Sequence, residues 1–519
     1  MVVSRMKRAA IVACVMAFAA TLNAAAQSAQ PAQETKPAAM PTVVCASVPS
    51  EDITHCPADT SAGVVLQKTT GKGACILGKS WGYDATSVWV MDGCSGEFAT
   101  GSALPAGGTQ NLPSPPVPPE RIEQWGEFSP GDGFLVGRGS GGQLSISGYA
   151  LARYVNQSPG TQTYTDHLGN ERSVDGRNDI YPHRTMVFFK GWLGNPKLIY
   201  AITFWTVLST DQNAIFGVLG YQFNRKFSLY AGLNGNPGSR SLQGSHPFWL
   251  GHDRVMADEF FRPYFGSGVW AQGEPIRGLW YNTVVTTANS VLGVKSSQLD
   301  RRFTTGGSVW WMPTTKEFGP RGNYGDYEHH DKVATRFGFS AVQSPEERFT
   351  NSTTGGTDNT TLRLADGVNL FETGALANGV TVDTADYRIL SFDAGVKYKG
   401  IFLQTEVYNR WLDNFKADGV LPVTSVHDAG FYVQGGFFPV PKKIEAYGIT
   451  SQIYGDKDAG FSNSSEYGVG MNFYPFDTRN HRLNIQLLDV NKSPVSSAFG
   501  YYIGGLDGKA FSVGFSVFF

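Results

Sequence analysis

The chain ends in the stretch Ala510-Phe-Ser-Val-Gly-Phe-Ser-Val-Phe-Phe519. Successive side chains of a β-strand point to opposite faces, so positions 511, 513, 515, 517 and 519 share one face, which is entirely apolar. Mostly small side chains fill the other face. This alternation predicts a final strand with one side in an apolar environment. Such a strand fits the wall of a membrane-spanning β-barrel, and the last strand of a soluble β-sandwich is the alternative.

The same alternation recurs in hairpins further up the chain. Apolar side chains share one face along residues 215–223 and again along 227–233, and residues 390–398 and 401–407 repeat the pattern. Small, polar or charged side chains fill most of the opposite positions. Strands of about ten residues, apolar outward and polar inward, are what a bilayer requires, because no backbone group can stay unpaired in hydrocarbon.

Sixteen segments of the chain have the pattern of barrel strands. They lie near 143–154, 183–193, 197–208, 213–223, 227–235, 265–272, 278–289, 305–312, 333–342, 386–398, 401–412, 429–438, 444–454, 466–474, 482–489 and 510–519. We therefore predict an all-β fold, a transmembrane antiparallel barrel of about sixteen strands preceded by a small disulfide-rich β module.

The connections between these segments alternate in length. If the barrel begins in the periplasm, the connections on that side are short turns, and the others include long loops at 155–182, 236–264, 343–385 and 490–509. Outer-membrane barrels have this asymmetry. The connection 313–332 is long where a short one is expected. A strand pair missed or misplaced there would change the count, so fourteen and eighteen strands are the alternatives.

Composition agrees with a folded β-rich chain and excludes a disordered one. The 519 residues include 62 Gly, 34 Phe, 22 Tyr and 11 Trp, and only 17% are charged. Arg5, Lys7 and Arg8 precede an apolar stretch that ends near Ala26, which predicts a signal peptide over residues 1–26. Beyond it no run of about 18 apolar residues exists, so a membrane span requires a barrel.

Charge sets limits on the partners of the mature chain. Removing residues 1–26 leaves 39 basic and 44 acidic side chains, a net charge of −5, because the signal contains three basic residues and no acidic one. This balance predicts no strong attraction to nucleic acid or to an acidic membrane surface.

Cys14 resembles a lipidation site only loosely, since it lies inside the apolar stretch of the signal.

All cysteines of the mature chain lie in one short module. Cys45, Cys56, Cys75 and Cys94 predict two disulfides in an exported protein, with all three connectivities open. Spacings of 11, 19 and 19 lack the close pairs of a zinc site. The predicted organisation is a linker at 27–44, the periplasmic cysteine module at 45–98, a Pro/Gly-rich linker at 99–133 and the barrel at 134–519.

The cysteine module resembles a bacterial domain family of unknown function, number 3011. The motifs that carry the resemblance are Cys75…Gly-Lys-Ser-Trp81-Gly82 and Val88-Trp89-Val90…Gly93-Cys94. The resemblance implies no assigned chemistry. Trp81 and Trp89 fit the core of a small domain, and the alternative is that they stack on a glycan such as peptidoglycan.

The region from about residue 121 to the end is similar to the outer-membrane proteins called porin O and P, or phosphate-selective porins. The stretches that carry this resemblance include Gln124-Trp-Gly-Glu-Phe, Ala257-Asp-Glu-Phe-Phe-Arg-Pro263, Trp311-Met-Pro-Thr-Thr and Asn472-Phe-Tyr-Pro-Phe476. The resemblance implies a sixteen-stranded barrel, often a trimer, through which small anions diffuse. The cysteine module lies outside this family's pattern.

Charged side chains on the polar face of the strands are the candidates for lining the pore. They are Arg153, Arg336, Lys397 and Arg410, with Asp393 and Glu406 beside them. Fixed cations in a low-dielectric wall concentrate anions and repel cations. The alternative is that charges of both signs pair with each other along the wall.

Three motifs point weakly towards enzymes. Gly137-Arg-Gly139-Ser-Gly-Gly142 fits a dinucleotide-binding pattern, but a strand follows it where a helix is needed. Glu328-His329-His330-Asp331 contains metal-ligating residue types, but adjacent histidines on a strand point to opposite faces, and the sequence shows no third ligand cluster. Asp258-Glu259 are too close in sequence to straddle a glycosidic bond.

The sequence therefore predicts a porin of the bacterial outer membrane and not an enzyme, with no cofactor and no metal. The expected partners are outer-membrane lipid, small solutes or anions, other copies in a homotrimer, and peptidoglycan through the cysteine module. A secreted or surface-associated β-sandwich that binds ligands or hydrolyses them is the alternative.

Overall fold

The computed structural model describes residues 41–100 apart from positions 49–52, 62, 72, 79 and 85, and then 133–207, 212–244, 248–287, 302–348, 362–496 and 501–519. The expected signal peptide and most of the two expected linkers lie outside these residues. The chain divides into two compact units, Met1–Gln110 and Asn111–Phe519, and each is described by itself.

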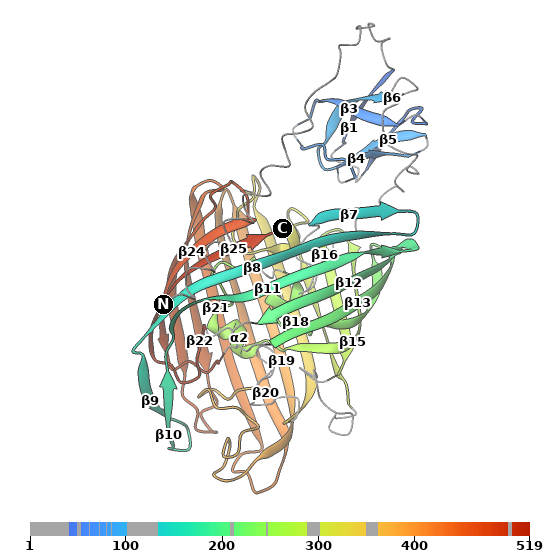
Figure 1. The fold of residues 1–519 in the computed structure, drawn as a ribbon. Coiled ribbons are helices and arrows are strands. Elements are labelled where there is room, and N and C mark those ends of the chain that lie inside the picture. The colour runs from blue at the N-terminus through green and yellow to red at the C-terminus, as the bar shows by residue number, and fades with distance from the viewer. Residues whose placement is uncertain are drawn as a thin grey trace, which may run out of the picture. The chain divides into compact units, whose positions relative to one another are not determined.

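The second unit is a closed antiparallel β-barrel (Figure 1). Sixteen described strands form the ring: β8 (Gly142–Ser158), β11 (Asn178–Leu193), β12 (Asn195–Val207), β13 (Gln212–Asn224), β14 (Phe227–Gly235), β15 (Phe265–Ile276), β16 (Leu279–Thr286), β17 (Thr304–Trp311), β18 (Ala334–Glu347), β19 (Val382–Tyr398), β20 (Ile401–Ala417), β21 (Ser425–Val440), β22 (Ile444–Tyr454), β23 (Ser464–Phe473), β24 (His481–Asn491) and β25 (Gly508–Phe518). Each pairs with its neighbour in sequence order, and β25 pairs with β8 to close the ring.

A further strand, β7 (Phe134–Gly139), pairs with the part of β8 that β25 does not reach. The ring of Phe134 stacks on that of Phe519, 5.9 Å away. The glycine-rich motif at 137–142 forms the turn between β7 and β8, so a strand and not a helix follows it. The geometry that cradles a phosphate at a helix N-terminus is therefore absent from this described motif.

The predicted fold class is confirmed. All sixteen predicted strand segments coincide with the sixteen strands of the ring, and most of the differences lie at strand ends. No strand pair was missed at 313–332. That connection contains only turns and the short 3-10 helix η4 (Pro320–Gly322), so the alternatives of fourteen and eighteen strands are wrong for the described chain.

The outer face of the barrel is an apolar belt. The odd-numbered residues of β25 point outward, as their spacing predicts, and Phe515 is 44% exposed while its neighbours Gly514 and Ser516 are buried. Ile215, Leu403 and Val469 expose more than half of their surface on other strands. A contiguous apolar surface of this kind is stable against lipid and not against water, so the barrel is a transmembrane one.

The two ends of the barrel differ. At one end the strands are joined by turns as short as Gly194 or Lys399-Gly400, and the connections at the other end include long segments. The first long segment carries a hairpin that the sequence did not predict, β9 (Thr161–Thr165) and β10 (Glu171–Asp175), at the lower left of Figure 1. Arg172 joins this hairpin to Glu372 of the β18–β19 connection, with 2.9 Å between nitrogen and oxygen.

The first unit consists of two small sheets. Strands β1 (Thr42–Ala46), β6 (Ser95–Thr100) and β3 (Val64–Thr69) form one, and β2 (Thr54–Pro57), β5 (Ser87–Val90) and β4 (Trp81–Tyr83) form the other. Disulfides join Cys45 to Cys56 and Cys75 to Cys94, which selects one of the three connectivities left open by the sequence.

Both tryptophans of the module lie in its core. Trp81 is 5% exposed and Trp89 is 2% exposed, and the Trp81 ring lies 4.8 Å from that of Phe98. A Cβ on Gly82 would overlap the Trp89 ring, so only glycine fits beside it. This burial agrees with a core role and leaves neither ring an open face for stacking on a sugar.

Reducing the two disulfides is expected to destabilise the module strongly. They close loops with sequence separations of 11 and 19 residues, and a loop of this size contributes about 3 kcal/mol in the chain-entropy model. Limited proteolysis with and without dithiothreitol checks this. New cleavages within residues 41–100 with the barrel intact are expected, and unchanged resistance of the reduced module would contradict it.

Candidate functional site: the barrel lumen

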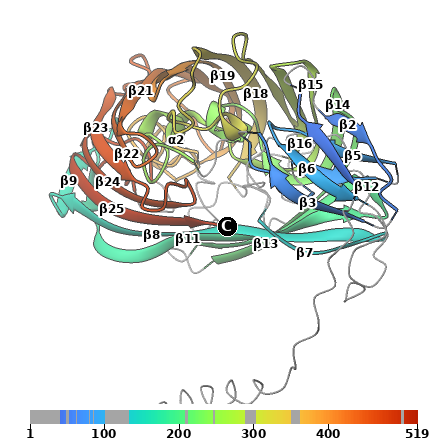
Figure 2. The ribbon, with the colours of Figure 1, turned by 90° about the horizontal axis from the view of Figure 1, so that it is seen from above.

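A segment between β14 and β15 lies inside the barrel. Residues 236–264, described apart from 245–247, carry the 3-10 helix η2 (Arg240–Gln243) and the barrel's short helix α2 (Met256–Phe261). Seen from above, α2 lies within the ring of strands (Figure 2), and it contacts β20, β21 and β22. Nearly every described residue of the segment is buried. We call it the lumen segment. Among the described residues, no helix is long and apolar enough to cross a membrane.

The first part of the lumen segment is attached to β18 and β20. The backbone N–H of Arg240 donates to Glu406 Oε1 over 3.0 Å, and its Nη1 donates to Gln404 over 2.9 Å. Gln243 donates to Ser340 Oγ over 3.0 Å. These bonds join a connecting segment to wall residues more than 90 positions away in sequence.

The helix α2 is held at both of its ends. At its start, the N–H of Met256 donates to Glu466 Oε2 on β23 over 2.9 Å. At its end, the Phe261 ring stacks on Tyr408 of β20 at 5.0 Å, and the Arg410 guanidinium lies 3.9 Å from the centre of the Phe260 ring. Because these contacts come from separate strands, the helix cannot shift without breaking several at once.

The stretch before α2 is attached to β23 and β24. Asn472 on β23 donates to the carbonyl of Leu250 over 2.9 Å, and Arg482 on β24 donates to the carbonyl of Gly251 over 3.1 Å. The lumen segment therefore reaches from β18 to β24 across the interior and narrows the path that a solute would take.

The connection 312–333 also folds against the inner wall, from the end of the barrel with the short turns. The Lys397 ammonium donates to the carbonyls of Phe318 and Asn323, over 2.7 and 2.9 Å. Asp326 accepts a bond from the N–H of Gly400 over 2.7 Å and also bonds to His330. This connection is long because it fills space in the barrel, and not because it contains strands.

His330 is expected to stabilise this connection only while it is charged. Burial alone would lower its pKa, but the hydrogen bonds that the charged ring donates to Asp326 and Glu317 outweigh that effect, and the pKa is raised from 6.5 to about 9, with Lys397 opposing the rise. Because the folded pKa lies above the unfolded one, the stabilisation is complete below about pH 6.5 and disappears as the pH rises through about 9.

The measurement compares wild type with His330→Gln. The difference in free energy of unfolding is expected to be about 2 kcal/mol at pH 6, the usual contribution of a hydrogen bond to a charged group, and close to zero above pH 9.5 or so. A difference that grows from pH 6 to pH 10 would contradict the assignment.

The six candidate pore residues all lie on the inner face, and all are buried. Arg336 pairs with Asp393 over 2.8 Å and Arg410 with Asp428 over 2.6 Å, while Glu406 accepts from the lumen segment. Arg153 lies on the ring of Tyr501, 4.6 Å from its centre. The structure thus brings these residues together mainly as paired anchors, which is the alternative that the sequence left open, and not as a ladder of solvated cations.

Residues 236–264 were expected from the sequence to form an external loop, and that expectation is wrong, because they lie in the lumen. One signal was available. The stretch Phe248-Trp249-Leu250 and the later Val255-Met256 and Phe260-Phe261 are too apolar for a loop in water. Asp258 and Glu259, considered as a catalytic pair, bond to Ser241 and Arg262 within the same segment.

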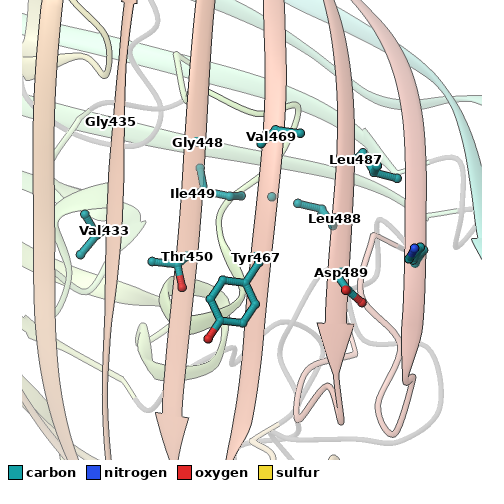
Figure 3. Close-up of a pocket in the computed structure, with 12 residues that line it drawn as sticks. Val433, Gly435, Gly448, Ile449, Thr450, Tyr467, Val469, Leu487, Leu488 and Asp489 are labelled. Carbon is teal, nitrogen blue, oxygen red and sulfur yellow. The ribbon is translucent and has the colours of Figure 1, made fainter.

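A groove of about 560 Å³ lies on the outside of the barrel and not in the lumen (Figure 3). It runs over the small outward residues Gly435 and Gly448 and is bordered by Tyr467, Val469 and Leu487, which are 58%, 62% and 45% exposed. Since these side chains belong to the apolar belt, the groove faces lipid and is not part of a solute path.

The cysteine module matches a known domain family. Residues 42–113 match the family described as Protein of unknown function (DUF3011). The match includes all four cysteines of the module and agrees with the resemblance found in the sequence. It assigns no chemistry to the DUF3011 module. A comparison of the whole chain with curated proteins finds no match.

Solved structures with a similar arrangement are outer-membrane proteins. OmpT of Vibrio cholerae has a TM-score of 0.45 at 10% identity, covering 74% of this chain and 100% of its own. The anion-selective porin from Comamonas acidovorans has a TM-score of 0.42 at 11% identity, covering 73% and 100%. The channel DcaP of Acinetobacter baumannii has a TM-score of 0.39 at 10% identity, covering 75% and 99%. Similarity this low carries no solute preference over to this chain, whose fold rests on its own strand pairing.

Proposed function

We propose that this protein is a channel of the bacterial outer membrane through which small hydrophilic solutes diffuse passively. The observation that carries the proposal is the combination of a closed barrel, an apolar outer belt and an inner face of hydrogen-bonding side chains narrowed by the lumen segment. An outer face of this kind needs lipid, and a polar inner face serves the passage of water and polar solutes.

Solute entry into liposomes tests the proposal. Proteoliposomes in an isotonic solution of a small neutral solute such as arabinose should swell, and the rate should fall as the solute becomes larger. Heat-modifiable, correctly folded protein that gives no swelling with any solute would contradict a diffusion channel. The β-sandwich alternative of the sequence analysis does not fit the closed ring.

A preference for anions such as phosphate is the more specific function that we propose for this channel. It rests on the resemblance of residues 121–519 to porins O and P and on two inner-wall cations. Lys397 and Arg482 are bound by carbonyl oxygens, and within the described chain no carboxylate lies at ion-pair distance from either. Their charge is therefore less neutralised than that of Arg336 or Arg410, and it would attract anions.

The reversal potential in a salt gradient measures this preference. With KCl more concentrated on one side, an anion-preferring channel is expected to give the sign of a chloride potential. Replacing Lys397 and Arg482 by glutamine should move that potential towards cation preference. A cation-selective wild type would contradict the anion assignment without affecting the proposal of a channel.

The remaining assignments are proposals of the same kind. The short-turn end of the barrel and the DUF3011 module would face the periplasm, and the module would be the part that approaches peptidoglycan, through a surface other than its buried tryptophans. The barrel would assemble as a homotrimer. Protease accessibility in intact cells and cross-linking in detergent test location and assembly separately.

A further inference from the structure

The groove on the outer face of the barrel lies between a row of small and apolar residues and a row of polar ones (Figure 3). The members of the first row are directly opposite one another on β21 to β24: Gly435, Gly448, Val469 and Leu487. The second row follows on β22 to β25: Thr450, Tyr467, Asp489 and Lys509. The groove therefore lies where the apolar belt meets a polar border.

The packing of the barrel itself does not require the glycine at position 448. A Cβ added to Gly448 would lie 3.7 Å from the carbonyl oxygen of Gly468, an ordinary contact distance, and would meet no closer atom. The inward-facing Gly468 and Gly470 differ, because a Cβ on them would overlap the side chains of Leu488 and Tyr447. The interior thus requires Gly468 and Gly470, whereas Gly448 keeps the outer face recessed.

In a bilayer this recess is filled by hydrocarbon. It belongs to the face that contacts lipid, where an empty recess loses dispersion contacts and a water molecule finds too few hydrogen-bond partners. Its volume of about 560 Å³ is in the range of pockets that hold small ligands. A flexible acyl chain can follow a groove of this size between neighbouring side chains.

Two opposite charges lie at the polar border of the groove. Asp489 and Lys509 are exposed, and they are directly opposite each other on β24 and β25. Within the described chain, neither lies at ion-pair distance from a residue of opposite charge. Directly opposite residues have Cβ atoms about 5 Å apart, so one small headgroup can reach both. Tyr467 beside them is of the residue type that is enriched at the level of lipid headgroups.

We propose that the groove binds one lipid molecule whose headgroup carries both a phosphate and a primary ammonium group, as phosphatidylethanolamine does. One acyl chain lies over Gly435 and Gly448, the phosphate pairs with Lys509, and the ammonium pairs with Asp489. A headgroup with negative charge alone fits less well, because Asp489 repels it. The site is on the outer face, so its occupation does not depend on what passes through the lumen.

Native mass spectrometry of the full, folded chain in detergent measures how many lipid molecules stay bound. The wild type is expected to retain one phosphatidylethanolamine at a roughly tenfold lower concentration than it needs for phosphatidylglycerol, which has no ammonium. Gly448→Leu fills the recess and should weaken the retention of phosphatidylethanolamine about tenfold. The matched control is Gly217→Leu. Gly217 is exposed on β13 outside the groove, and a Cβ there would also lie 3.7 Å from its nearest neighbour.

The two charges are tested separately. Lys509→Gln should weaken the binding of both lipids about fivefold, as expected for one lysine near a lipid phosphate. Asp489→Asn should abolish the preference for phosphatidylethanolamine, because the ammonium loses its partner and phosphatidylglycerol is no longer repelled. Both side chains are exposed, so these variants are expected to fold, and they carry the test if Gly448→Leu does not form a heat-modifiable barrel.

Three results would overturn the proposal. Equal retention of phosphatidylethanolamine by the wild type, Gly448→Leu and Gly217→Leu would show that the groove holds no particular lipid. Equal retention of the two lipids by the wild type would show that Asp489 and Lys509 do not select the headgroup. A Gly448→Leu variant that changes from oligomer to monomer with unchanged lipid retention would assign the groove to a second copy of the chain.

Discussion

Replacing residues 236–264 by a two-residue Asn-Gly turn is expected to raise the single-channel conductance severalfold. Gly235 and Phe265 are directly paired at the ends of β14 and β15, so a tight hairpin turn can join them without altering the ladder. The deletion removes α2 and η2 from the interior. Because ionic current depends on the narrowest section of the path, the unobstructed lumen should conduct more.

Two further variants make this prediction sharper. Glu466→Gln weakens the bond to the N–H of Met256, and replacing Asn472 by Leu removes the donor to Leu250. Each should leave the mean conductance near wild type and increase the open-channel noise, because the lumen segment is then held less firmly. A folded deletion variant with wild-type conductance would show that the segment does not limit the current.

Asp428→Asn is expected to cause the largest loss of stability. Asp428 and Arg410 are both completely buried and lie 2.6 Å apart, and Arg410 also contacts Phe260 of the lumen segment. Removing one charge of a buried pair leaves the other uncompensated, which costs about 3–5 kcal/mol. The midpoint of urea unfolding of the reconstituted barrel measures this loss.

A matched exposed pair provides the control. Arg348 and Asp383 lie 3.2 Å apart, and their side chains are 42% and 47% exposed. Asp383→Asn should therefore cost no more than about 1 kcal/mol, since solvent screens the pair. If the two asparagine variants unfold at the same urea concentration, the buried Arg410–Asp428 pair stabilises the barrel no more than the exposed pair does. Replacing Arg410 and Asp428 together by Met and Leu should recover much of the stability.

The strands could be predicted because lipid imposes a strict alternation on them. In β25 the outward residues Phe511, Val513, Phe515 and Val517 are all apolar, and a register shift of one residue would place all of them in the lumen. The pairing of consecutive strands then follows from the short turns. The same reasoning gave the inner position of Arg153, Arg336, Lys397, Arg410, Asp393 and Glu406, since parity alone determines it.

Arg336 and Arg410 pair with carboxylates on neighbouring strands, but the bonds that Glu406 and Lys397 make could not be predicted, because their partners lie in connecting segments. The N–H of Met256 bonds to a residue 210 positions away, and Arg240 bonds to Glu406 across 166 positions. Connecting segments have no periodicity, so the sequence does not say whether such a segment projects into solvent or folds inward. The length of 313–332 suggested missing strands for the same reason.

The uncharged polar residues of the inner face show a different limit. Strand parity alone places Gln272, Asn282 and Ser308 on that face, but the residues expected to line the pore were the charged ones only. Several of their polar atoms have no hydrogen-bond partner in the described protein. This could not be predicted from the sequence, because it depends on what else fills the lumen.

The most direct test of the channel is the current through purified protein in a planar bilayer. Insertion of the folded barrel is expected to raise the conductance in discrete steps of uniform size, and the steps should disappear when the protein is unfolded by heating before addition. Folded, heat-modifiable protein that inserts into the bilayer and produces no steps would contradict the account.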